Sequence, residues 1–140
     1  MVAGFVPYWL ANEEWHGLLS QDLTSQTLIG LSLIIIGAGI TLYCIYKFAT
    51  EGKGTLSPAD PTKRLVVKGL YRYSRNPMYI GVMLMLVGES TASRSATLWI
   101  YSLCVFTMFY LFILLFEEPR LKKDFGDEYD AYCKKVARWL

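Results

Sequence analysis

Apolar positions occur in long uninterrupted blocks along this chain, separated by polar segments that contain glycine and proline. No charged residue occurs from Thr27 to Ile45 or from Ala96 to Phe116, and a shorter block extends from Met78 to Gly88. Each longer block has about 20 residues, which as a helix is enough to cross about 30 Å of hydrocarbon. Hydrophobic residues make up 54% of the chain, and both blocks are internal and too long for the apolar core of a signal peptide. The pattern predicts an integral membrane protein with one domain over residues 1–140.

Pro77 is the expected start of the Met78–Gly88 helix. Proline lacks an N–H group, but in the first turn of a helix that group would have no partner, so proline is tolerated there. After this helix, the segment from Glu89 to Ser95 is expected to form a short turn on the far side of the membrane. The segment from Glu51 to Pro61 contains glycine and proline and is the expected break between the first two helices. Three full or near-full transmembrane helices are therefore expected.

Glycine recurs at a spacing of seven residues in two of these apolar blocks. Gly30 and Gly37 lie in the first block, and Gly81 and Gly88 lie in the second. In lipid, small residues mark the places where helices approach closely, because apolar surface alone does not drive helices together. These two helices are expected to pack through their glycine faces.

The two ends of the chain differ from the spans. Residues Val2 to Ala11 are apolar but only about half as long as a span, which leaves open an interfacial helix, a partly inserted helix or the remnant of a first span. Near the C-terminus, apolar residues recur at spacings of three and four and predict an amphipathic helix interrupted near Gly126: Leu121, Phe125, Tyr129, Tyr132, Val136 and Trp139. The expected fold is an all-α integral membrane protein, with three transmembrane helices between a short N-terminal apolar helix and a C-terminal amphipathic segment.

Charged residues are distributed unevenly between the two ends of the expected spans. Lysine and arginine are concentrated between Lys47 and Arg75 and after Phe116, whereas residues Asn12 to Gln26 include acids but no lysine or arginine. Because basic segments beside a span face the cytoplasm, the motif loops and the C-terminus are expected on the cytoplasmic side. Nucleic acid is not an expected partner, since the basic residues border the membrane, and membrane lipids are the expected neighbours.

Two polar clusters occur at the ends of apolar blocks. Arg75 and Asn76 precede the helix that starts at Pro77, where free N–H groups and the positive end of the helix dipole favour a carboxylate or phosphate. Glu117 and Glu118 directly follow an uncharged block, and two adjacent acids at a membrane boundary are costly unless they are paired or functional. Together the clusters could hold one zwitterionic ligand, with Arg75 on its anion and Glu118 or Glu117 on an ammonium or sulfonium. A positive-inside anchor is the alternative interpretation of Arg75.

No other reactive arrangement competes with these clusters. The sequence contains no Ser-His-acid set, no cysteine beside a histidine, no phosphate-binding loop and no metal-ligand spacing. Neither a disulfide framework nor a metal site is expected from the three cysteines, which are Cys44, Cys104 and Cys133. In-line methyl transfer from a sulfonium depends mainly on positioning and desolvation. That reaction suits a site with so few acid–base residues.

Two sets of motifs follow in order over the last two thirds of the chain. The first set comprises Gly52-x-Gly54-Thr55, Asp60-Pro61, Leu65-Val66-x-x-Gly69-x-Tyr71, Arg75-Asn76-Pro77-x-Tyr79-x-Gly81 and Gly88-Glu89. The second set is Glu117-Glu118-Pro119-x-Leu121, Phe125-Gly126-x-x-Tyr129-x-x-Tyr132 and Val136-x-Arg138-Trp139. In this order and spacing the chain resembles the isoprenylcysteine carboxyl methyltransferase and phospholipid methyltransferase superfamily.

The resemblance implies a small membrane enzyme that uses S-adenosylmethionine, with the cofactor held between the last helices and the C-terminal segment. A lipophilic small molecule or lipid is the expected methyl acceptor at the cytoplasmic face, because the site lies where the helices leave the bilayer. Its cofactor-site motifs are expected within residues 52–89 and 117–139. The catalytic residues that it implies are Arg75, Asn76 and Tyr79. The cofactor-binding residues that it implies are Arg75, Tyr79, Gly81, Glu117, Glu118, Phe125, Tyr129 and Tyr132.

The chain departs from the pattern of this superfamily at two places. Asn76 stands where histidine is commonest, so the site lacks a base that titrates near pH 7. The apolar residues Phe112, Ile113 and Leu114 stand where eukaryotic prenylcysteine enzymes carry an arginine, which leaves the methyl acceptor open. Two alternatives remain: a nicotinamide-dependent sterol or enone reductase with a similar C-terminal architecture, and a non-catalytic membrane interaction protein.

Overall fold

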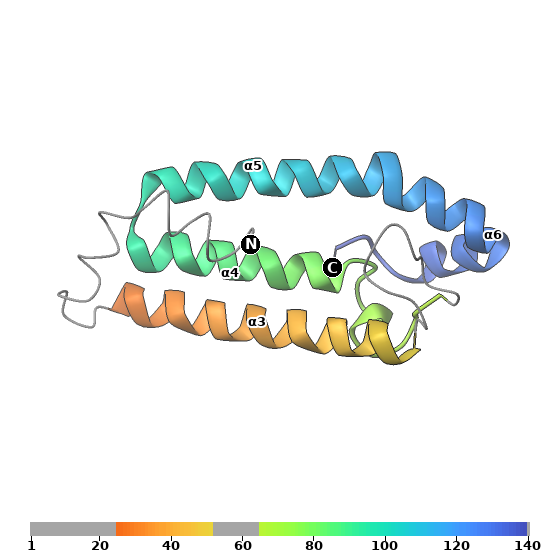
Figure 1. Cartoon of the computed structure of the whole chain (residues 1–140), viewed down its shortest axis with the longest axis horizontal. Coiled ribbons are helices and arrows are strands. Elements are labelled where there is room, and N and C mark those ends of the chain that lie inside the picture. The colour runs from red at the N-terminus through yellow and green to blue at the C-terminus, as the bar shows by residue number, and fades with distance from the viewer. Residues whose placement is uncertain (1–24, 52–64, 140) are drawn as a thin grey trace. The chain divides into compact units, whose positions relative to one another are not determined.

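The computed structural model describes residues 25–51 and 65–139, which are mostly helical (Figure 1). In chain order, the elements are α3 (Ser25–Glu51), the 3-10 turn η1 (Gly69–Arg72), α4 (Pro77–Ser93), α5 (Ala96–Phe112), the π-helical turn η2 (Ile113–Glu117) and α6 (Glu118–Lys135). Between Ser74 and Ala137 there is an isolated parallel bridge, and the described residues form no strand. The all-α expectation is confirmed for this part of the chain. The short N-terminal helix expected from Val2 to Ala11 lies outside the described residues.

Two compact units divide the described chain. The first unit contains residues 25–39 and 81–109, and the second unit contains residues 40–51, 65–80 and 110–139. The boundaries fall inside α3, α4 and α5. Each of these three helices therefore contributes one segment to each unit.

In the first unit, α3 and α4 approach each other through glycine (Figure 1). A Cβ atom on Gly88 would lie 2.6 Å from the carbonyl oxygen of Gly30, and a Cβ atom on Gly37 would lie 2.5 Å from that of Gly81. Cβ atoms essentially never come this close to other atoms, so only glycine permits this backbone separation. The predicted packing through two glycine faces is confirmed.

The end of α4 in the first unit differs from the sequence expectation. The segment from Glu89 to Ser95 is not a turn, because α4 continues to Ser93 and only Arg94 and Ser95 separate it from α5. The hydroxyl of Ser90 donates a hydrogen bond to the carbonyl of Leu86, at 2.8 Å, within the helix. Serine and threonine favour turns through local hydrogen bonds, but in a helix they can bond the carbonyl four residues earlier instead. Their presence therefore did not end the helix here.

In the second unit, residues that precede α4 pack against α3. Val66, Tyr71 and Cys44 are buried together, and Phe48 packs against them. Val66 and Tyr71 therefore lie inside the second unit rather than on its surface. The Tyr132 hydroxyl adds a hydrogen bond of 2.6 Å to the carbonyl of Tyr71. This contact connects η1 to α6.

Among the described residues, two helical segments are long and apolar enough to cross a membrane, namely Ser25–Thr50 and Ala96–Lys135. Both carry large apolar side chains on their outside, such as Ile35 on α3 and Ile100 on α5. The third expected span is α4, whose 17 residues would extend about 26 Å at about 1.5 Å per residue. That length is short of about 30 Å of hydrocarbon, so the described residues contain two candidate spans and the third stays a prediction.

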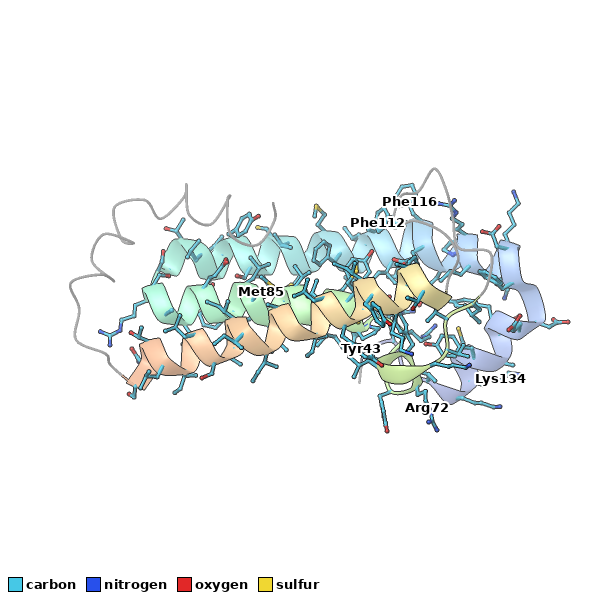
Figure 2. All side chains as sticks on the ribbon, turned by 60° about the horizontal axis from the view of Figure 1, so that its bottom comes forward. Tyr43, Arg72, Met85, Phe112, Phe116 and Lys134 are labelled. Carbon is cyan, nitrogen blue, oxygen red and sulfur yellow. The ribbon has the colours of Figure 1, made fainter. Side chains whose placement is uncertain are left out.

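α6 is amphipathic and is interrupted at Gly126, as the sequence predicted. Gly126 has φ 48° and ψ −122°, which is not helical, and a positive φ is readily adopted by glycine. Tyr129 is buried after this kink, whereas the charged Glu128 is exposed. In Figure 2, Arg72 of η1 and Lys134 of α6 extend outward, and both are exposed. One face of the kinked helix α6 therefore packs against the rest of the second unit, and its charged face is exposed.

Candidate functional site

A small cavity of about 60 Å³ lies within the second unit. Its lining residues come from α3, from the segment 65–76 that contains η1 and precedes α4, from η2 and from α6. Residues of both sequence motifs therefore line the same cavity. The lining residues are Phe48, Leu65, Val66, Tyr71, Arg75, Asn76, Ile113, Glu117, Glu118, Leu121, Tyr129 and Tyr132. Charged groups thus meet aromatic rings in a half-enclosed space.

Glu117 and Glu118 are positioned by an irregularity in the helix that leads to them. The N–H group of Glu118 donates to the carbonyl of Ile113, five residues earlier, which defines the π-helical turn η2. Pro119 follows and has no N–H group, so regular helical bonding is interrupted there in any case. A π turn rotates the side chains that follow it, and such turns are frequent at functional sites.

Glu118 lies between two arginines. Arg138 approaches it with two donors, Nε at 2.8 Å from Oε1 and Nη2 at 3.0 Å from Oε2. Arg75 makes a single contact, Nη1 to Oε1 at 3.2 Å. Hydrogen bonding to Glu118 raises the pKa of Arg138 further above its ordinary value. A bidentate arginine–carboxylate pair is the stronger and more directional arrangement, so Arg138 is the main partner of Glu118.

The side chain of Arg75 has a buried donor with no partner among the described residues. Its Nη1 also donates to Cys133 Sγ at 2.8 Å, but its Nε atom is buried and makes no hydrogen bond in the described part of the chain. The side chain of Arg75 is 14% exposed. A buried unpaired guanidinium donor is costly, and it marks a place suited to an anionic ligand.

Glu117 accepts a hydrogen bond from the other motif. The hydroxyl of Tyr79, in the first turn of α4, donates to Oε2 of Glu117 at 2.9 Å. Pro77 opens α4 as expected, and this places Tyr79 on the turn closest to the two acids. The two motifs, which are about 40 residues apart in sequence, are therefore joined directly by Tyr79–Glu117 as well as by Arg75–Glu118.

The C-terminal segment is fastened to the residues before α4. The N–H group of Arg75 donates to the carbonyl of Ala137 at 3.0 Å. The carbonyl of Arg138 accepts from Ser74 Oγ at 3.3 Å and from Asn76 Nδ2 at 3.1 Å. Asn76 is buried, and its side-chain amide holds the backbone of the C-terminal segment at the edge of the cavity.

Most of the expected site residues meet in this unit. The cavity is lined by Arg75, Asn76, Glu117, Glu118, Tyr129 and Tyr132, and Tyr79 joins it through Glu117. Gly81 lies in the first unit, where it packs against Gly37, and Phe125 is not among the lining residues. The assignment of roles to these residues stays a prediction.

Two further residues were not singled out from the sequence. Arg138 and Cys133 both contact the polar cluster. Arg138 stands in the quoted C-terminal motif before Trp139, and that position was the available signal. Cys133 follows Tyr132 in an amphipathic pattern, and nothing in that pattern distinguishes it from a solvent-facing residue. All three cysteines are free.

Comparison with known proteins assigns the chain to a family. A model of the phospholipid methyltransferase family matches residues 25–128. The chain belongs to this family. Together with the two long apolar helices, membership of the phospholipid methyltransferase family indicates a membrane protein.

Two kinds of enzyme are among the individual proteins that this chain resembles. A very-long-chain enoyl-CoA reductase from Dictyostelium discoideum is 27% identical over 126 residues, 89% of this chain and 40% of the relative. A probable protein-S-isoprenylcysteine O-methyltransferase from Oryza sativa is 27% identical over 112 residues, 77% of this chain and 57% of the relative. The chain thus spans about half the length of these curated relatives. No solved structure matches it.

Proposed function

We propose that this protein transfers a methyl group from S-adenosylmethionine to a lipophilic or amphipathic acceptor at the cytoplasmic face of the membrane. The observation that carries the proposal is the buried Nε of Arg75, which has no hydrogen-bond partner in the described part of the chain, in a cavity lined also by Glu117 and Glu118. A guanidinium group suited to an anion and two carboxylates suited to a cation line the same cavity. Membership of the phospholipid methyltransferase family supports the reaction type.

The residues present fit the charged end of S-adenosylmethionine, which carries a carboxylate, an ammonium and a sulfonium. Arg75 would hold the carboxylate, and Glu118 or Glu117 the cationic groups. The rings of Tyr129 and Tyr132 would border the sulfonium, since aromatic faces attract cations. When bound, the cofactor supplies the electrophilic methyl group.

Binding requires the polar cluster to open. The cavity of about 60 Å³ is below the range of roughly 300–1,000 Å³ that is usual for small-molecule pockets. The contact that must give way is the single one between Arg75 and Glu118, because a ligand carboxylate would replace Glu118 as the partner of Arg75. The chain's contribution to catalysis is then to orient the ligand and to exclude water.

The acceptor is expected to arrive as a nucleophile. Asn76 offers an amide where a base would be needed, and that amide is already bonded to the Arg138 carbonyl. The acceptor would therefore be a carboxylate, a thiolate or an amine that loses its proton to water or to a carboxylate such as Glu118. A lipophilic acceptor fits a site at the end of apolar helices, where an entrance between helices would face lipid.

The first experiment measures binding of S-adenosylmethionine to the purified protein in detergent by calorimetry. Glu118→Gln is expected to weaken binding by about 1.5–3 kcal/mol, the scale of a hydrogen bond to a charged group. Glu128→Gln is the matched control, because Glu128 is an exposed glutamate on the same helix. Absence of binding by the wild type would reject the proposed function, and equal affinities of both variants would remove Glu118 from the site.

The second experiment measures methyl transfer from labelled cofactor into a lipid extract and into a panel of soluble amines and acids. Arg75→Lys is expected to lose most of the activity, because the ammonium group of lysine cannot form the two coplanar hydrogen bonds that a guanidinium group donates to a carboxylate. Arg72→Lys, at an exposed arginine of η1 (Figure 2), is the control. Activity restricted to the soluble panel would contradict a lipophilic acceptor.

The proposed orientation places η1 and the C-terminus in the cytoplasm and the α4–α5 turn on the opposite side, with α4 as a third, short span. The test is impermeant thiol labelling of Lys68→Cys and Arg94→Cys, both at exposed positions. The background lacks the native cysteines Cys44, Cys104 and Cys133. Labelling of both variants from the same face would contradict a spanning α4.

A nicotinamide-dependent enone reductase is the second candidate. It is favoured by the 27% identity to the enoyl-CoA reductase, which extends over 89% of this chain. Binding of NADPH, measured beside S-adenosylmethionine on the same preparation, separates the two. NADPH binding without S-adenosylmethionine binding would replace the proposed methyl transfer by reduction.

A further inference from the structure

The two arginines on Glu118 are held in different ways. Arg138 has two short contacts to the carboxylate, whereas Arg75 has one longer contact. Arg138 is also fixed from its other side, because its backbone carbonyl accepts bonds from Ser74 and Asn76. Its guanidinium carbon lies 5.8 Å from the centroid of the Tyr110 ring, within the range of a cation–π contact.

Arg75 is held less completely. Its Nε donor is buried without a partner among the described residues, and its remaining polar side-chain contacts are to Glu118 and to the thiol of Cys133. A thiol is a weak acceptor. Of the two guanidinium groups, Arg75 is therefore the one that can exchange its partner at low cost.

We propose that Arg138 is a positioning residue that occupies Glu118 and thereby leaves Arg75 available to bind the anionic group of the ligand. This inference rests on the proposed function and deepens it. Without the Arg138 side chain, Glu118 would be a buried carboxylate with one cation nearby. It would then draw Arg75 into a full bidentate pair, because a buried charge without a partner is strongly unfavourable.

The consequence is a specific defect in anion recognition. A ligand carboxylate would have to compete with Glu118 for Arg75, whereas the contacts of the aromatic part of the ligand, and of a cationic group held by Glu117, would change little. A side chain that merely stabilised the C-terminal segment would instead affect every ligand equally. The fastening of that segment uses the backbone carbonyl of Arg138, which side-chain variants retain.

The experiment compares S-adenosylmethionine with its decarboxylated analogue, which lacks the carboxylate. Calorimetry on the detergent-purified full chain gives the ratio of the two affinities. The wild type is expected to prefer S-adenosylmethionine by about tenfold or more, the size of a charge-assisted hydrogen bond. Arg138→Gln is expected to reduce this preference to about twofold or less, and Arg138→Lys to restore part of it. Lys135→Gln, at an exposed lysine nearby, should match the wild type.

A second comparison tests whether Arg138 acts through Glu118. In a Glu118→Gln background, adding Arg138→Gln should change the affinity for S-adenosylmethionine by less than about twofold, because neighbouring residues of one network are not additive. Two results would overturn the positioning role while leaving the proposed function intact. One is an Arg138→Gln variant that keeps the wild-type preference for S-adenosylmethionine over its decarboxylated analogue. The other is an equal loss of affinity on adding Arg138→Gln to the wild type and to Glu118→Gln. A wild type that binds neither compound would overturn both. Thermal unfolding of each variant identifies any that fail to fold. If Arg138→Gln does not fold, the affinity ratio of Arg138→Lys tests the positioning role in its place.

Discussion

Substitution of Gly88 by alanine tests the helix packing of the first unit. A Cβ atom at this position would lie 2.6 Å from the carbonyl oxygen of Gly30, 2.8 Å from Cγ1 of Ile34 and 2.9 Å from the backbone nitrogen of Ile34. Two of these three atoms belong to the backbone of α3, so relief requires α3 and α4 to move apart. Forcing an extra carbon into a packed interior typically costs about 1–3 kcal/mol. Gly88→Ala should therefore lose about that much free energy of unfolding.

Gly39→Ala is the matched control for this substitution. Gly39 lies on the same helix as Gly30, but a Cβ atom there would have no atom within 4 Å. Alanine favours a helix over glycine by about 1 kcal/mol in water, so this variant should be as stable as the wild type or slightly more stable.

Thermal unfolding in a mild detergent, followed by circular dichroism, compares the two variants under identical conditions. At about 2–4 °C per kcal/mol for a chain of this size, Gly88→Ala should lower Tm by roughly 2–12 °C and Gly39→Ala should not lower it. Equal Tm values for the two variants would refute the close approach of α3 and α4. A loss confined to Gly39→Ala would show that the glycine faces were assigned the wrong way round.

Three further predictions concern the second unit. Tyr79→Phe removes the donor to Glu117 and should weaken cofactor binding about tenfold in calorimetry; an unchanged affinity would place this pair outside the site. Gly69→Ala should cost about 1–2 kcal/mol in thermal unfolding, since Gly69 has φ 65° and its Cβ would meet the hydroxyl of Tyr43; a fully stable variant would contradict this. Burial raises the pKa of the Tyr71 hydroxyl, so the folded state favours its neutral form more strongly than the unfolded state does. The free energy of unfolding should therefore be unaffected by this group below about pH 10 and should fall as the pH rises above it. Tyr71→Phe should show a smaller alkaline loss in unfolding at pH 8–11, and an unchanged loss would exclude Tyr71 as a source.

Much of the helical architecture could be predicted from local signals. The start of α4 at Pro77, the start of α5 at Ala96 and the interruption of α6 at Gly126 agree with the structure. These features depend on a missing N–H group, on hydrophobic blocks or on a backbone conformation that suits glycine, which are properties of a residue and its neighbours. The glycine spacing also predicted which faces of two helices meet, because only small residues allow backbones to approach in lipid.

Segments whose local signals are weak could not be assigned from the sequence, and the turn expected from Glu89 to Ser95 was wrong for this reason. The hydroxyl residues after Gly88 could form either a turn or a helix, and here they bond back into α4. Val66 and Tyr71 are buried because Cys44 and Phe48 of α3 pack against them. A choice between two local conformations of similar energy is made by burial, and burial depends on residues that are distant in the sequence.

For the candidate site, the sequence by itself determined the two charged clusters, the family resemblance and the absence of a titratable base at Asn76. Only the tertiary structure decided how those charges are paired. Arg75 and Glu118 face each other, and Arg138, which lies 20 residues beyond Glu118, takes two of its hydrogen-bonding positions. The physical reason is that the fastening of residues 137–138 to residues 74–76 brings a third charged side chain to the site. Pairing between charges depends on separation in space, and these separations are set by long-range backbone contacts that no local pattern encodes.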